Sequence, residues 1–165
     1  MHLPEHILDV FLQPGEFYWG DTSTRIRTIL GSCVSIIFWH PKKKEGGMCH
    51  YVLPESSIDE LLEMPYPGRY GNGAWELFMK EIYKTHTKPN EYQIKIFGGS
   101  SLFSNQEEGI LRKTNIVNVG EKNILFAKKR MAENNLHLVS ENVGGLRPRR
   151  IHFEIWSGNV WLKRL

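Results

Sequence analysis

The sequence contains two cysteines, and one of them, Cys33, follows a glycine and a serine at the end of an apolar segment. A cysteine nucleophile needs an accessible sulfur at a backbone turn, where amide groups can stabilise a developing oxyanion. Gly31 has no side chain that would obstruct a substrate, and a Gly31-Ser32 turn can leave backbone amides unpaired. Taken alone, this pattern favours an inert, buried cysteine, because free cysteines usually pack in the core.

A histidine, His50, lies 17 residues after Cys33, beyond a lysine- and glycine-rich turn. This spacing predicts a hairpin in which Cys33 opens one strand and His50 lies near the start of its neighbour. Strand alternation places His50 on one face with Met48 and puts Cys49 on the opposite face. An imidazole that faces a thiol can hold it as a thiolate and later protonate a leaving group. We therefore predict that Cys33 is a nucleophile, His50 its base and Cys49 a packing residue; a structural role for His50 is the alternative.

A third side chain that orients the imidazole would complete a catalytic triad. Thr28 lies five residues before Cys33, on the strand that leads into the same turn. Its hydroxyl can hydrogen-bond a ring nitrogen, although threonine is also a common strand residue. We predict Thr28 as the third catalytic residue, and Gly31 and Ser32 as the turn that forms the oxyanion site.

A metal ion or another cofactor is not expected. Seven histidines and two cysteines are enough ligands in number, but they have no CxxC or HExxH spacing. The segment 98–101 follows a strand but lacks the lysine of a phosphate-binding loop. The basic groups at 42–44 and 147–150 are short and have no interleaved aromatics, which favours an acidic protein partner over nucleic acid.

The length of 165 residues and the hydrophobic fraction of 41% are typical of one globular domain, which we expect to cover residues 1–165. No apolar run approaches the ~18–20 residues that cross a bilayer, and the amino terminus has no signal-peptide pattern. We therefore expect a cytoplasmic protein with reduced cysteines and no membrane insertion.

The elements that would position these residues are mostly strands. We expect strands at 7–12, 25–30, 33–39, 48–53, 92–97, 136–140, 151–156 and 160–163, and helices at about 57–64, 74–84 and 119–134. Ser57 and Asn118 are the expected helix caps. Helices and strands do not alternate regularly, which favours an α+β layered sandwich over a Rossmann sheet. The glycine pairs at 46–47 and 98–99 are expected to form loops that keep the site open.

Together these segments resemble the CheD family of chemoreceptor glutamine deamidases, over about Arg25 to Val160. The motifs that carry the resemblance are Leu30-Gly31-Ser32-Cys33-Val34, the run from Gly46 to Pro54 around His50, Tyr70-Gly71 with Ala74 and Glu76, Lys95-Ile96-Phe97-Gly98-Gly99, Val119-Gly120-Glu121-Lys122-Asn123, and Gly144-Gly145 before Arg149-Arg150-Ile151-His152-Phe153. Cys49 stands where the family often has asparagine, and Pro148 stands where glycine is common. Arg27 and Thr28 can both align with the family's catalytic threonine, and we prefer Thr28 because arginine cannot serve in that role.

The resemblance implies a layered αββ sandwich of mixed or antiparallel sheets with two main helices, related to bacterial deamidase toxins. It implies that Cys33 and His50 convert glutamine side chains to glutamate through a thioester, without a cofactor, on the cytoplasmic helices of methyl-accepting chemoreceptors. It also implies hydrolysis of glutamate methyl esters and binding of a CheC-type phosphatase. The alternatives are a non-catalytic chemotaxis adaptor and another Cys-His hydrolase, such as a thiol protease or an acyltransferase.

Overall fold

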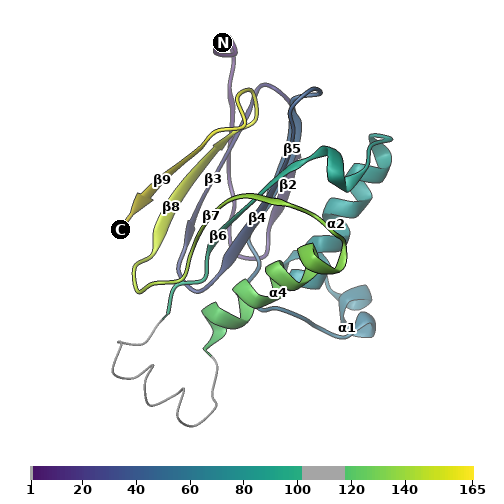
Figure 1. The fold of residues 1–165 in the computed structure, drawn as a ribbon, viewed down its shortest axis with the longest axis vertical. Helices are drawn as coiled ribbons and strands as arrows, with labels where there is room; N and C mark the ends of the chain where they lie inside the picture. Colours follow the sequence, from purple (N-terminus) through teal and green to yellow (C-terminus); the bar gives the residue numbers. More distant parts are fainter. Residues whose placement is uncertain (1, 102–117) are drawn as a thin grey trace.

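The computed structural model describes residues 2–101 and 118–165, and these residues form three layers (Figure 1). The strands are β1 (Leu8–Phe11), β2 (Phe17–Gly20), β3 (Thr24–Leu30), β4 (Val34–His40), β5 (Glu45–Cys49), β6 (Gln93–Gly98), β7 (Leu138–Val143), β8 (Arg149–Glu154) and β9 (Val160–Arg164). The helices are α1 (Ile58–Glu63), α2 (Gly71–Lys84) and α4 (Val119–Glu133), with short 3-10 helices η1 (Pro67–Arg69) and η2 (Pro89–Glu91).

Two sheets make up the strand layers. The five-stranded sheet has the order β2-β5-β4-β6-β7, and the four-stranded sheet has the order β1-β3-β8-β9. Helices α2 and α4 lie on one face of the five-stranded sheet, and the four-stranded sheet lies on its other side (Figure 1). This arrangement confirms the α+β layered sandwich that the sequence pattern favours and has the αββ layers that the family resemblance implies. No helix within the described ranges is both long enough and apolar enough to cross a membrane.

Strand β4 is central to the fold, and every residue from Val34 to His40 is buried. A strand covered on both faces is apolar throughout, because neither face meets water. Val34, Ile36 and Phe38 pack toward the helices, whereas Ile37 and Trp39 pack toward the four-stranded sheet. Side-chain direction along β4 therefore decides which of the two core layers a residue joins.

The hairpin of β4 and β5 differs from the sequence prediction at its turn. Gly46 and Gly47 are buried within β5 and do not form a loop. A Cβ on Gly46 would lie 2.2 Å from the carbonyl oxygen of Phe38, so the close approach of the two strands requires glycine there. The prediction that His50 lies near the start of the second strand is also wrong. His50 follows the end of β5, which in an antiparallel hairpin is beside the start of β4.

Strand β2 was not predicted, because it is a short edge strand whose pairing with β5 is long-range. Helix α2 begins at Gly71, before the predicted Ala74, and the amide of Gly71 donates to the carbonyl of Leu53 at 2.8 Å. The two predicted caps are present: Ser57 forms a capping box on α1, and the side chain of Asn118 accepts from the amide of Glu121 on α4.

Candidate active site

Cys33 lies in the three-residue connection that leads from β3 in one sheet to β4 in the other. All three carbonyls of residues 31–33 accept hydrogen bonds. The amides of Ser100 and Gly99 donate to residues 31 and 33 at 2.9 and 2.8 Å, and the side chain of Asn123 donates to residue 32 at 3.0 Å. The peptide units of the turn are therefore held in a fixed orientation.

The amides of the same turn point to no acceptor on another residue within the described ranges. The position where Gly31 would carry a Cβ is open, since no heavy atom of the described residues other than its chain neighbours lies within 4 Å. Converging backbone amides beside a nucleophile can stabilise the oxyanion of an acyl-transfer reaction. The turn at Gly31 and Ser32 thus combines unpaired amides with open space, two features that an oxyanion site needs.

His50 is held by backbone and side chain alike. Its amide donates to the carbonyl of Glu16 at 3.1 Å, and its carbonyl accepts from the amide of Gly15 at 2.7 Å. Its ring nitrogen Nδ1 lies 2.7 Å from the hydroxyl of Thr28, which is fully buried. His50 is therefore held through its backbone and through Nδ1 of its ring, with only 3% of the residue exposed.

The hydrogen bonds of Thr28 determine the tautomer of the imidazole. The hydroxyl of Thr28 has a single proton and donates it to the carbonyl of Leu12 at 2.8 Å. It must therefore accept from Nδ1–H of His50, and the neutral ring then carries an unprotonated Nε2 that can act as a base. Arg27, the alternative alignment, faces the other side of β3 and forms a salt bridge with Asp9 at 2.6 Å.

Cys33 and His50 lie on the same face of the five-stranded sheet. Val34 and Tyr51 form an antiparallel bridge, with amide-to-carbonyl distances of 3.1 and 3.0 Å, and both of their side chains pack toward the helices. Their neighbours Cys33 and His50 therefore point to the opposite face, and Cys33 packs against the core between the sheets. In this register the two are diagonal cross-strand neighbours, which are typically ~7–8 Å apart between backbones and within reach of long side chains.

Both groups are uncharged near neutral pH. Burial raises the pKa of the Cys33 thiol above its ordinary value of 9.0, an effect that its own backbone amide and the cation of Arg69 partly offset. Burial also lowers the pKa of His50 from 6.5 to about 4. A neutral thiol and a neutral imidazole on one face of the sheet differ from the preformed thiolate that the sequence suggested, because such an imidazole would have to take the proton as the sulfur attacks.

Cys49 is outside this site. It packs in the core on the helix side of the sheet, its sulfur accepts from the amide of Ile36 at 3.3 Å, and burial raises its pKa to about 12. Among the residues that the structure describes, no three histidine, cysteine or acidic side chains cluster closely enough to hold a metal ion.

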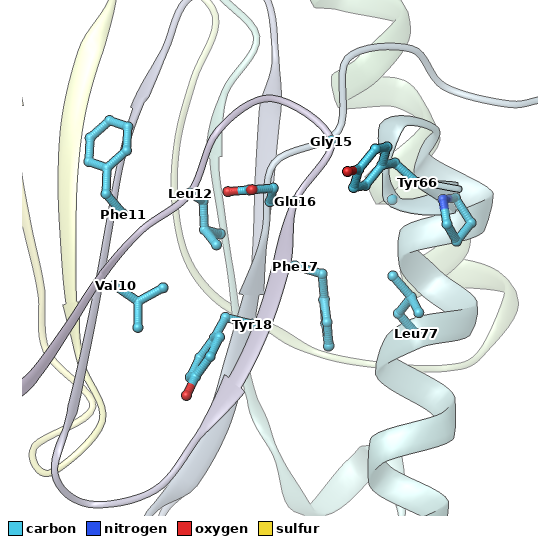
Figure 2. A pocket seen from close by; sticks show the side chains of 11 residues that line it. Val10, Phe11, Leu12, Gly15, Glu16, Phe17, Tyr18, Tyr66 and Leu77 are labelled. Atoms are coloured by element: carbon cyan, nitrogen blue, oxygen red, sulfur yellow. The ribbon is translucent and has the colours of Figure 1, made fainter. Parts of the chain in front are cut away.

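An apolar groove of about 520 Å³, whose lining side chains are drawn in Figure 2, adjoins the segment that hydrogen-bonds the backbone of His50. Phe17 and Leu77 face each other across it, and Tyr66 lies at one end. Its wall includes Leu12, Gly15 and Glu16, whose backbone groups hold Thr28 and His50. The groove is therefore continuous with the segment that supports the candidate base. It is lined by Val10, Phe11, Leu12, Gly15, Glu16, Phe17, Tyr18, Tyr66, Pro67, Gly68 and Leu77.

Known proteins match this chain over almost its full length. The family model described as CheD chemotactic sensory transduction matches residues 52–164. The "Probable chemoreceptor glutamine deamidase CheD 3" of Dechloromonas aromatica is 43% identical over 159 residues, which cover 96% of this chain and 89% of the relative. The "Probable chemoreceptor glutamine deamidase CheD 1" of Leptospira interrogans is 45% identical and covers 98% and 95% of the two chains. The "Probable chemoreceptor glutamine deamidase CheD" of Pseudomonas syringae pv. tomato is 37% identical and covers 99% and 93%.

The chain belongs to the CheD family.

The matched region of the CheD model begins two residues after His50. The family model does not include Cys33, His50 or Thr28, so the support for their roles in this CheD protein comes from the geometry described above. Two further residues at the site were not predicted from the sequence. Asn123 belongs to a motif that resembles the family but had no predicted role, and no motif in the sequence indicates Arg69, whose positive charge lowers the pKa of Cys33.

Proposed function

We propose that this CheD protein is a protein-glutamine deamidase that converts glutamine side chains on the cytoplasmic helices of chemoreceptors to glutamate. The observation that carries the proposal is the hydrogen-bond chain from His50 through Thr28 to the carbonyl of Leu12. It leaves a proton-accepting nitrogen on an imidazole that shares a sheet face with Cys33. The names of the relatives, which are chemoreceptor glutamine deamidases, support the same substrate class.

The first half of the reaction forms a thioester. Nε2 of His50 takes the proton of the Cys33 thiol while the sulfur attacks the side-chain carbonyl carbon of glutamine. The carbonyl oxygen becomes an oxyanion that the amides of residues 31–33 stabilise. The intermediate collapses when the carbon–nitrogen bond breaks, and His50 gives its proton to the departing ammonia.

The second half releases the product. His50, neutral again, removes a proton from water as the water oxygen attacks the thioester carbon. The carbon–sulfur bond then breaks, Cys33 regains its proton, and the substrate side chain leaves as glutamate. A glutamate methyl ester would pass through the same thioester with methanol as the leaving group, so we also propose methylesterase activity.

The decisive experiment incubates the protein with a purified receptor cytoplasmic fragment and maps glutamine-to-glutamate conversion by peptide mass spectrometry. The Cys33→Ala variant and free glutamine serve as controls. Conversion by the wild-type protein alone, with an intact receptor chain and no turnover of free glutamine, is the expected result. Receptor binding without conversion would instead identify an adaptor, and chain cleavage would identify a thiol protease.

We further propose that a CheC-type phosphatase, where the organism has one, competes with the receptor for this site. Cys33 is the more exposed member of the pair and His50 is almost fully buried, so both partners would approach from the side of Cys33. Two protein segments cannot occupy that position together. Addition of the phosphatase should therefore slow receptor deamidation, and simultaneous, non-competing binding of both partners would contradict this proposal.

A further inference from the structure

A buried asparagine on α4 connects the two segments that carry the candidate catalytic residues. Asn123 is fully buried, and its side-chain nitrogen donates to the carbonyls of Ser32 at 3.0 Å and Val52 at 2.9 Å. Both partners are acceptors, so the nitrogen and not the oxygen of the amide must face them. Ser32 directly precedes Cys33, and Val52 lies two residues after His50.

These hydrogen bonds lie where the two segments separate. Val34 and Tyr51 form the last paired position of the hairpin on this side. Beyond it, the amides of Val52 and Leu53 donate to the carbonyl of Arg69 instead of to the cysteine turn. The side chain of Asn123 spans the resulting gap, where a continued β-ladder would have supplied a backbone hydrogen bond.

The rest of the asparagine side chain gains little from its position. Its oxygen Oδ1 is buried and has no hydrogen-bond partner among the described residues. A buried acceptor without a donor lowers stability. The contact that anchors this part of α4 is made by the backbone, since the hydroxyl of Tyr51 donates to the carbonyl of Asn123. The polar atoms of the side chain therefore make only the two donated hydrogen bonds among the described residues.

We propose that Asn123 is a positioning residue whose amide sets the spacing between the segments that carry Cys33 and His50. It touches neither the thiol nor the imidazole, and it acts through the backbone on either side of them. The inference rests on the proposed function, because positioning matters here for proton transfer between the two side chains. Without the amide bridge, the carbonyls of Ser32 and Val52 lose their shared partner, and the amides of Gly99 and Ser100 alone hold the cysteine turn, which no longer has a link to the histidine segment on this side.

The test uses Asn123→Leu, which has a similar volume and no donor. Receptor deamidation should lose roughly 10- to 100-fold in kcat, as expected for a small misplacement of reacting groups, with KM within about twofold. The pH profile of Cys33 alkylation should also move to lower pH. Burial raises the pKa of this thiol in the wild-type protein, and a loosened turn would expose the thiol and lower its pKa. If the leucine variant does not fold, Asn123→Ser, which is smaller and keeps one donor, should show the same two changes to a smaller extent.

Asn118→Ala is the matched control, since it removes the cap of α4 and lowers stability without touching the bridge. It should leave kcat and the alkylation profile unchanged at a temperature well below its unfolding midpoint. Folded Asn123→Leu with a wild-type kcat and alkylation profile would overturn the inference, and so would Asn118→Ala if it reproduced both changes. A wild-type protein that does not deamidate the receptor would refute the proposed function, while the alkylation comparison would still test the bridge.

Discussion

Acidification should destabilise this protein mainly through one side chain, His50. The folded structure holds its imidazole neutral, because burial lowers its pKa from 6.5 to about 4. Between pH 6.5 and pH 4, the imidazole of His50 is protonated in the unfolded chain and unprotonated in the folded chain. The free energy of unfolding is therefore unaffected by the titration of this group above pH 6.5, and it decreases as the pH falls from 6.5 toward 4.

The magnitude follows from the two pKa values. Their difference of 2.5 (6.5 − 4) corresponds to about 3 to 4 kcal/mol in the free energy of unfolding, at about 1.4 kcal/mol per unit. About 2 kcal/mol of this should be lost between pH 7 and pH 5, since the unfolded imidazole is then almost fully protonated. A loss of this size is a large fraction of the stability of a typical domain, ~5–15 kcal/mol.

The assay is urea unfolding of wild-type protein and His50→Gln at a series of pH values, followed by the fluorescence of the five tryptophans. The variant has no titrating group at this position, so the difference between the two curves isolates His50 from groups such as His152, whose pKa burial also lowers. Wild-type stability should fall by about 2 kcal/mol more than that of the variant between pH 7 and 5. Parallel curves would refute the account of His50 as a buried, neutral base.

Cys33→Ala should abolish deamidation and preserve the fold, whereas Cys49→Ala, on the opposite face of the sheet, should keep most of the activity; the reverse order in folded protein would contradict the nucleophile assignment. Thr28→Val should lower kcat at least about tenfold because His50 loses the acceptor that selects its tautomer, and Thr28→Ser should restore most of it; an equal loss in both variants would point to packing instead. Alkylation of Cys33 should keep rising up to and beyond pH 9, and a plateau below pH 7 would show a preformed thiolate. Deamidation should survive chelators, which a metal-dependent loss on dialysis would contradict.

The sequence predicts the face of each residue better than the ends of each element. Alternation along the hairpin correctly separates Cys49 from His50, because a residue's side is set by its position in the strand whatever the strand's exact end. The same rule explains why Thr28, and not Arg27, points inward to the histidine. The start of β5 was predicted at Met48 and not at Glu45, because Gly46 and Gly47 are typical turn residues when taken alone.

The residues that the sequence did not assign act across large separations in the chain. Asn123 contacts Ser32 across 91 positions, and the backbone of Glu16, which directly precedes β2, hydrogen-bonds the backbone of His50. A pattern of residue types records neighbours within a strand or helix, but it does not record which distant segments meet. Long-range hydrogen bonds of this kind are therefore known only from the three-dimensional structure.

The uncharged state of the site gives Thr28 a larger role than it would have beside a charged pair. In a thiolate–imidazolium pair both ring nitrogens carry protons, so no tautomer has to be selected. In this site the imidazole is neutral, and only the form with the proton on Nδ1 leaves Nε2 free to accept from Cys33. The carbonyl of Leu12 selects that form indirectly, because it takes the single proton of the Thr28 hydroxyl and leaves the oxygen as an acceptor. A backbone group outside the reacting pair thus determines which nitrogen can act as the base.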